Sequence, residues 1–431
     1  MLARSLTFSP AEDESFFQEL PSLPAVFSLH GDGEPYVSKT RDLRRRIRRL
    51  LGEPTELTKR LNLRGRVREI AFTPTGSDFE SQFLLYQLLR ASLPKTYAAR
   101  LRLRPAPLIK LHVENPYARA SVTTRIGALP SRDQAAASLP HPALHPEEHA
   151  RVSKPESGNL YYGPFLSRTA AEKFSSDALD LFQMRRCVED LHPDPTFPGC
   201  VYSEMRMCLA PCFKGCTDDE YQTEVSRVRA FFDSRGESLT RELESQRERL
   251  SGELAFEEAA LIHARLEKLR HMLGQLPEIA QRIDRLDAVI LQPSAEPGAV
   301  CLFRFYRAQL LGPVKFGVDP QYKAEAFGSR GTESDSGKPQ TSKPQTMESR
   351  VETAIHAFSP PERVSAQEHT EHLALLKRWY YRSNRAGEIF FAEEGRWPLR
   401  RVVRGIARVY RGEKRGELTS FPVTPADRSS S

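Results

Sequence analysis

The stretch PAVFSLHGDGEPYVSKTRDLRRRIRRLL, residues 24–51, predicts the first folded unit of this chain. Apolar and β-branched residues flank Gly-Asp-Gly, so we expect two short strands joined by a tight turn. A helix should follow at once, and six of the ten residues from Arg41 to Leu50 are arginine. Such a helix can be a solvated basic face or part of a site that acts on nucleic acid, and charge alone does not separate the two.

The same unit continues downstream of the basic helix. RVREIAFTPT, residues 66–75, predicts a third strand. SDFESQFLLYQLLRASL, residues 77–93, predicts a helix that begins at the capping residue Ser77, with Glu80 three residues later. The resulting β-β-α-β-α order indicates a small α/β unit over residues 21–105, and the residues before it, 1–20, are expected to form a polar leader.

Length and charge limit the class of protein. A chain of 431 residues exceeds the size of one hydrophobic core, so we expect several domains. A formal net charge of +7 favours an anionic partner, with nucleic acid first, although 28% charged residues also fits an ordinary globular protein. The sequence has no run of eighteen apolar residues and no apolar signal segment at its start, so we predict a cytoplasmic protein without a membrane partner.

The rest of the chain divides by pattern. A connector is expected over residues 106–182, with an unperiodic loop over 128–158. Helical spacing returns over residues 221–276 and predicts two antiparallel helices. An α+β region is expected over residues 282–417, with a Ser/Thr/Gly/Pro-rich flexible insertion over 325–350 and a polar tail over 418–431.

Five cysteines lie within thirty residues of one another, in the segment 183–220. Thiolates are soft ligands for zinc or for iron-sulfur iron, and a metal would hold together a proline-rich segment that has little apolar content of its own. The spacing fits neither a CxxC zinc pair nor the common ferredoxin run, so buried or surplus free thiols stay open as an alternative. The five are Cys187, Cys200, Cys208, Cys212 and Cys216; a sixth, Cys301, lies in a strand pattern and is expected in a core.

Several local motifs, in order, resemble one known family. They resemble the amino-terminal half of UvrC, the nuclease subunit of bacterial excision repair, and the shorter UvrC-like nucleases. The resemblance runs from about Leu23 to Pro320 and implies an α/β multidomain protein that acts in nucleotide excision repair within the SOS response. The motifs are YYGPF, LFQMRRC, GCVYSEMRMCLAPC, DDEYQTEVSRVRAFF and LAFEEAALIHARLEKLR.

The resemblance implies that residues 21–105 form a GIY-YIG-like nuclease domain. By motif, its catalytic residues would be Tyr36, Arg46 and Glu80. Glu80 would hold one Mg²⁺ or Mn²⁺, Arg46 would stabilise the charge that develops on the phosphate, and Tyr36 would be the general base. The implied activity is a metal-dependent, single-incision DNA endonuclease.

Four residues depart from the usual pattern of that domain. Ala25, Phe27, Ser38 and Ala98 stand where family members usually carry glycine, tyrosine, glycine and asparagine. Phe27 lacks a hydroxyl that could orient water, and Ser38 places a side chain where glycine allows close approach. An alternative therefore stays open, namely a catalytically decayed protein that binds DNA and a protein partner without cutting.

The basic residues predict contacts to the phosphates of a nucleic acid, and such contacts weaken as salt rises. The resemblance implies that this nucleic acid is damaged double-stranded DNA. RNA is a weaker candidate because no base-stacking aromatics interleave with the arginines. The predicted DNA-binding residues are Lys39, Arg41, Arg44, Arg45, Arg48, Arg49 and Lys110.

For the cysteines, the resemblance implies a [4Fe-4S] cluster, with Zn²⁺ as the alternative. The matching ligands would be Cys187, Cys200, Cys208 and Cys212, with Cys216 as a substitute.

The helical region resembles the UVR motif, which in the family docks on the helicase subunit UvrB. A helical hairpin that leaves part of its apolar seam uncovered gains by packing on a partner hairpin. The alternative is a hairpin packed on its own chain. Full-length UvrC also carries an RNase H-like nuclease and helix-hairpin-helix units, and we expect neither in so short a remainder. The seam predicted to bind the partner is Phe256, Ala259, Ala260, Ile262, Leu266 and Leu269.

Overall fold

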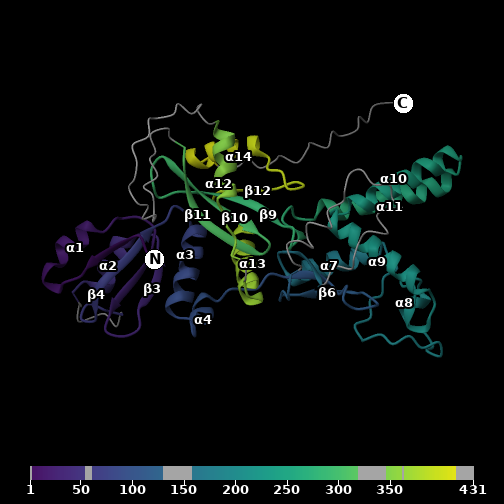
Figure 1. Ribbon diagram of the computed structural model, residues 1–431, viewed down its shortest axis with the longest axis horizontal. Helices are drawn as coiled ribbons and strands as arrows, with labels where there is room; N and C mark the ends of the chain where they lie inside the picture. The colour runs from purple at the N-terminus through teal and green to yellow at the C-terminus, as the bar shows by residue number, and fades with distance from the viewer. Residues whose placement is uncertain (1, 54–60, 130–157, 319–345, 362–363, 414–431) are drawn as a thin grey trace, which may run out of the picture.

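The computed structural model describes residues 2–53, 61–129, 158–318, 346–361 and 364–413. These residues form three four-stranded sheets, which we call the first, second and third sheet in chain order. Figure 1 shows the first sheet and the long helical hairpin at opposite ends of the molecule, with the third sheet between them. No helix in these ranges is long and apolar enough to cross a membrane.

The first sheet confirms the expected hairpin. Its order is β1-β4-β2-β3, with antiparallel neighbours, and Phe27 on β2 lies opposite Ser38 on β3. The predicted polar leader is wrong, because β1 and α1 join this domain and bury Phe8, Phe16 and Phe17 in its core. The elements are β1 (Arg4–Thr7), η1 (Pro10–Glu12), α1 (Asp13–Glu19), β2 (Ala25–Gly31), β3 (Tyr36–Thr40), α2 (Leu43–Leu51) and β4 (Val67–Pro74).

The basic helix α2 covers one face of the first sheet. The Asp42 carboxylate accepts a hydrogen bond from the Arg45 N–H at 2.9 Å and so caps the helix. Leucine and isoleucine at helical spacing point into the core while most arginines point away, which is the expected division of an amphipathic helix. The buried positions are Leu43, Ile47, Leu50 and Leu51.

The opposite face of the first sheet is covered by α3 (Asp78–Ser92), which is followed by α4 (Tyr97–Leu101). As predicted, Ser77 caps α3. This helix also packs on the third sheet, so one hydrophobic core spans both parts of the chain. Val37 of β3, Phe83 of α3 and Phe303 of the third sheet all belong to that core.

The second sheet and the helices after it carry the cysteines and the hairpin. Its strand order is β6-β5-β7-β8. Most of the predicted loop over 128–158 lies outside the described residues. The two predicted antiparallel helices are α10 and α11, and a third helix, α9, precedes them. The elements are β5 (Leu108–Leu111), β6 (Ala120–Thr123), β7 (Leu160–Gly163), α7 (Arg168–Leu179), α8 (Val201–Glu204), η2 (Pro211–Phe213), α9 (Asp218–Asp233), α10 (Glu237–Gly252), α11 (Phe256–Gly274) and β8 (Gln281–Arg282).

The third sheet confirms the predicted α+β region, and its order is β11-β10-β9-β12. One face packs on α13 and α3, and the other face packs on α12 and α14. The predicted insertion over 325–350 is wrong at its end, because α12 begins at Met347 under a Thr346 cap; residues 319–345 lie outside the described part. The elements are β9 (Asp287–Pro293), β10 (Ala299–Tyr306), β11 (Gln309–Gly317), α12 (Met347–His356), α13 (Ala366–Tyr380), β12 (Glu388–Phe391) and α14 (Leu399–Arg411).

Candidate nuclease-like site and its surroundings

The structure brings together two of the three predicted catalytic residues. Arg46 on α2 donates from Nη2 to the Tyr36 hydroxyl on β3 at 2.9 Å. The Arg46 Nε is buried and has no hydrogen-bond partner among the described residues. The ring of Phe27 lies 6.2 Å from that of Tyr36. The tyrosine and the arginine therefore form a pair on the α2 face of the first sheet.

Glu80, the predicted metal ligand, lies in a different environment. Its side chain is on α3 and only 3% of the residue is exposed. One carboxylate oxygen accepts the Gly76 N–H at 2.7 Å, and the other lies 3.6 Å from the Cys301 Sγ of β10. Among the described residues, no hydrogen bond or ion pair joins Glu80 to Tyr36 or Arg46. Burial raises the pKa of the Glu80 carboxyl, and the Gly76 N–H opposes this without reversing it.

The third sheet and α13 cover Glu80 through apolar and charged contacts. The Phe79 ring lies 5.0 Å from Phe303 of β10 and 5.2 Å from Trp379 of α13. At the rim, Asp78 pairs with Lys39 at 2.6 Å and with Arg382 at 2.5 Å. Lys39, predicted to contact DNA, is thus held by a carboxylate of its own chain.

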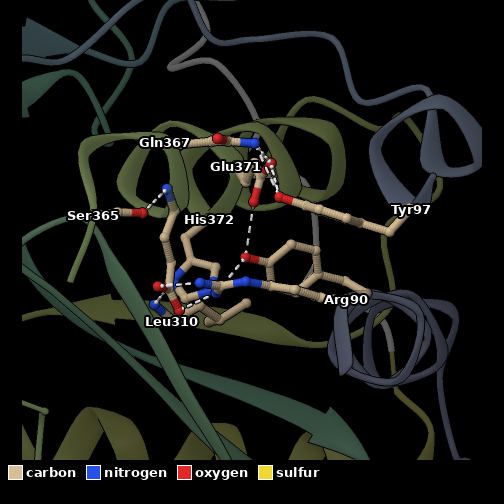
Figure 2. A network of polar contacts seen from close by, with 9 residues as sticks. Arg90, Tyr97, Leu310, Ser365, Gln367, Glu371 and His372 are labelled. Carbon is tan, nitrogen blue, oxygen red and sulfur yellow. Dashed lines mark hydrogen bonds and ion pairs between the residues drawn. The ribbon is translucent and has the colours of Figure 1, made fainter. Parts of the chain in front are cut away.

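A partly buried polar network fastens α13 to α3 and α4 (Figure 2). The hydroxyls of Tyr86 and Tyr97 each donate to the Glu371 carboxylate at 2.9 Å. Arg90 donates to Glu368 at 2.8 Å, which adds a charged contact between the same helices. Since every one of these bonds crosses between α13 and the helices of the first domain, the network holds the cover in place.

His372 on α13 belongs to the same network (Figure 2). Its Nδ1 accepts the Leu310 N–H of β11 at 3.1 Å, and its ring packs edge-on against Tyr86. Burial, with the nearby Arg90 charge, lowers the pKa of His372 to about 4. The imidazole is therefore neutral at pH 7.

The four residues that differ from the usual family pattern have different surroundings in the structure. Ala25 and Phe27 are fully buried in β2, so they serve as core. The Ser38 hydroxyl is half-buried and donates to the Lys39 carbonyl at 3.4 Å. Ala98 is exposed on α4.

The predicted DNA-binding residues separate into free and engaged groups. Arg44 donates to the carbonyls of Leu20 and Gln18, and Arg48 pairs with Glu14 at 3.1 Å. Lys110 lies over the Tyr161 ring at 5.9 Å. Three exposed arginines make no side-chain hydrogen bond or ion pair within the described part of the chain, and they leave α2 with a free cationic face: Arg41, Arg45 and Arg49.

The cysteine segment brings thiols near one another. Burial raises the pKa of the Cys208 thiol to about 11, although the Ala210 N–H opposes this, and the charges of Cys187, Cys212 and Cys200 raise it further. Within the described ranges, no three His, Cys, Asp or Glu side chains stand together closely enough to hold a metal ion, so a metal centre would need these thiols to converge further. The four residues are soft donors of the kind that a thiolate centre uses.

The two remaining cysteines have separate surroundings. Cys216 is partly buried against the core of the second sheet. Cys301 is fully buried in β10, which confirms its predicted place in a core.

The residues predicted to form the partner-binding seam are partly buried and partly exposed in the structure. Leu266, Leu269 and Ala259 are buried against their own chain, while Ile262 is half-buried. Phe256 and Ala260 are exposed. Two apolar residues that the prediction left out, Leu254 and Leu261, join Phe256 as exposed side chains where the hairpin turns and α11 begins; the exposed fractions of the three are 72%, 71% and 63% in that order.

Reasoning from the sequence missed three residues that shape these sites. Asp78 and Cys301 each contact a residue more than two hundred positions away in the sequence. No local sequence pattern predicts such contacts. Arg185, two residues before the first cysteine of the cluster, is 1% exposed. The sequence did offer a signal for Arg185, because a cation close to a predicted thiolate ligand can stabilise its negative charge.

Comparisons with known proteins show that the chain is similar to UvrC. The family profile described as "UvrC/Cho excinuclease, middle domain" matches residues 139–231. UvrABC system protein C of Idiomarina loihiensis is 27% identical over 261 residues, which are 60% of this chain and 38% of that protein. UvrABC system protein C of Haemophilus ducreyi is 25% identical to this chain. The match covers 67% of this chain and 42% of that protein.

These relatives are longer than this chain, which spans about two fifths of their length. No solved structure matches. The chain is UvrC-like over about two thirds of its residues, and that part includes the cysteine segment.

Proposed function

We propose that this UvrC-like chain serves nucleotide excision repair by binding damaged DNA and a UvrB-like partner, and that its GIY-YIG-like site does not cut DNA. The observation that carries the proposal is the burial of Glu80. Mg²⁺ keeps several waters and demands near-octahedral oxygen ligands. A carboxylate that is sealed from solvent, bonded to Gly76 N–H and raised in pKa is poorly suited to bind it.

The arginine face of α2 supports the DNA-binding half of the proposal. Arg41, Arg45 and Arg49 are exposed cations that form no ion pair within the described part of the chain. Such side chains bind phosphate without reading sequence, which suits a protein that recognises damage in any sequence context.

The tip of the α10–α11 hairpin supports the partner half. Leu254, Phe256 and Leu261 are exposed apolar side chains beside acidic residues of the first turn of α11. An apolar patch carried on a helix fits docking on a partner hairpin. The UvrC names of the relatives make a UvrB-like protein the first partner to test.

The cysteine segment supports a metal centre held by Cys187, Cys200, Cys208 and Cys212. A [4Fe-4S] cluster is the first candidate and Zn²⁺ the second. Such a centre would cross-link a coil that is otherwise held by few apolar residues.

A second candidate function, a metal-dependent single-incision endonuclease, is favoured by one observation. Arg46 and Tyr36 are hydrogen-bonded, as a base and a charge-stabilising group beside a phosphate would be. This candidate requires the third sheet to leave α3 so that Glu80 can reach solvent.

One experiment separates the two functions. Damaged duplex is incubated with the protein, with Mg²⁺ or Mn²⁺, and with a UvrB-type partner, and both binding and strand nicking are measured. We expect salt-sensitive binding without nicking, for the wild type and for Glu80→Gln alike. Nicking by the wild type that disappears in Glu80→Gln and in Arg46→Ala would establish the endonuclease instead.

A further inference from the structure

Arg185 has the most deeply enclosed guanidinium beside the cysteine segment. The residue is 1% exposed. Its Nε donates to the Tyr117 carbonyl at 2.8 Å and its Nη1 donates to the Glu189 carbonyl at 2.9 Å. The same Nη1 lies 3.3 Å from the Cys187 Sγ. The remaining nitrogen, Nη2, is buried and has no partner among the described residues.

The charge of Arg185 is unbalanced, whereas that of Arg282, the other arginine buried in the described part of the chain, is not. Arg282 is also buried, and it is paired with Asp284 at 2.8 Å and with Asp233 at 3.1 Å. Arg185 forms no ion pair with any described carboxylate; its anchored partners are two carbonyls and one sulfur. A buried cation is tolerated when an anion neutralises it. The group available for that purpose is the set of cysteine thiols, which lose their protons when they bind a metal.

We infer that Arg185 is the counter-ion of the cysteine centre and that its free Nη2–H donates to a sulfur of that centre. Four thiolates around Zn²⁺ or an iron-sulfur core leave a net negative charge, which a buried guanidinium offsets. Hydrogen bonds to the sulfurs set the potential of such a centre and the tightness with which metal is held. The inference rests on the proposed metal centre and is independent of whether the chain cuts DNA.

The backbone contacts give Arg185 its position. The Arg185 N–H donates to the Tyr221 hydroxyl at 3.1 Å, and that hydroxyl donates to the Ala118 carbonyl at 2.7 Å. These bonds tie the arginine to α9 and to the coil before β6, so the guanidinium is held before any metal binds. Arg185 is thus a positioning residue for the centre and is not itself a ligand.

The next residue offers a matched control. Arg186 has the same charge and lies one position closer to Cys187, but it pairs with Asp180 at 2.8 Å and stacks over the Tyr202 ring. No cysteine sulfur is bonded to Arg186 in the described ranges. Removing Arg186 therefore removes a local charge while it leaves the contact to Cys187 intact.

The test compares anaerobically purified wild type, Arg185→Met, Arg185→Lys and Arg186→Met. Iron and zinc are counted per chain, the rate of metal loss to a chelator is followed, and melting temperatures are measured with and without metal. We expect Arg185→Met to lose metal roughly ten to a hundred times faster than wild type, with Arg185→Lys in between and Arg186→Met unchanged. Without metal, Arg185→Met should melt no lower than wild type, because it removes an unpaired buried charge.

Two results would overturn the inference, and they have different meanings. If wild type carries metal and Arg185→Met keeps it equally well, or if Arg185→Met is destabilised equally with and without metal, then Arg185 is only a structural residue. If wild type binds neither iron nor zinc, the metal centre itself is refuted. Should Arg185→Met fail to fold, Arg185→Lys against Arg186→Met carries the same comparison.

Discussion

The same strands form both faces of the first sheet, but different elements cover the two faces. Alternate residues of β3 point to opposite faces, so Tyr36 meets α2 while Val37 meets α3. On the α2 face, Tyr36 and Arg46 form a hydrogen-bonded pair next to free arginines. On the α3 face, Glu80 is sealed under the third sheet. Catalytic residues must lie together at an accessible surface. On the covered face, the Glu80 carboxylate is instead part of the packing.

The largest effect is expected from loosening the cover itself. Phe303→Ala removes a ring that packs on Phe79 and Phe83, and such a truncation should cost about 3–5 kcal/mol of unfolding free energy. Ile406→Ala, on the opposite face of the third sheet, is the matched control. In native conditions, alkylation of Cys301 followed by mass spectrometry should rise in Phe303→Ala. If Cys301 alkylation rises equally in both variants, it reports a general loss of stability and not an opening of the third sheet over Glu80.

Acid should weaken the same cover through His372. The pKa of His372 is lowered to about 4 in the fold, against an ordinary value near 6.5. Its contribution is therefore fully present above about pH 6.5 and is lost as the pH falls toward 4, by up to about 3 kcal/mol. The raised pKa of Glu80 acts in the opposite sense, since its protonated form is favoured in the fold.

Denaturant midpoints measured between pH 7 and pH 4 check this dependence. His372→Gln should flatten the loss relative to wild type, because glutamine cannot take up the proton. The same slope in both proteins would place the acid sensitivity elsewhere.

A pair of substitutions at Glu80 measures what its carboxylate does in the fold. Glu80→Ala leaves the partly buried Gly76 N–H unpaired, and we expect a loss of about 1–3 kcal/mol of unfolding free energy. Glu80→Gln keeps an acceptor and should lose less. If Glu80→Ala is as stable as wild type by urea denaturation, Glu80 does not serve the packing.

The smallest effect is expected on the open face. Each of Arg41→Gln, Arg45→Gln and Arg49→Gln should lower the salt dependence of DNA binding by about one unit of the log–log slope, with little change in stability. Arg44→Gln is the contrast, because its guanidinium bonds to the Leu20 carbonyl. That variant should lose stability and keep the slope. Binding isotherms at several salt concentrations distinguish the two kinds of arginine.

Local pattern was enough to predict the hairpin of β2 and β3, the cap of α3 and the antiparallel pair α10 and α11. The meeting of Tyr36 and Arg46 also agrees with their ten-residue spacing. The leader was misjudged because its phenylalanines are too few to show a period, although they complete the core of α2. The burial of Glu80 could not be predicted, since it depends on β10, more than two hundred residues away.

The cysteine segment illustrates the same limit. Its residue types predicted a metal, but the convergence of the ligands and the position of Arg185 depend on α9 and on the coil before β6. Contacts of that kind are set by tertiary packing, which a single sequence does not reveal.

The most direct test of a binding role without incision is strand nicking of damaged duplex by wild type, Glu80→Gln and Arg46→Ala, with Mg²⁺ or Mn²⁺ and a UvrB-type partner present. We predict that all three bind the duplex in a salt-sensitive manner and that none leaves a nick. A metal-dependent nick made by wild type and lost in both variants would contradict this, because it would mean that Glu80 reaches the DNA.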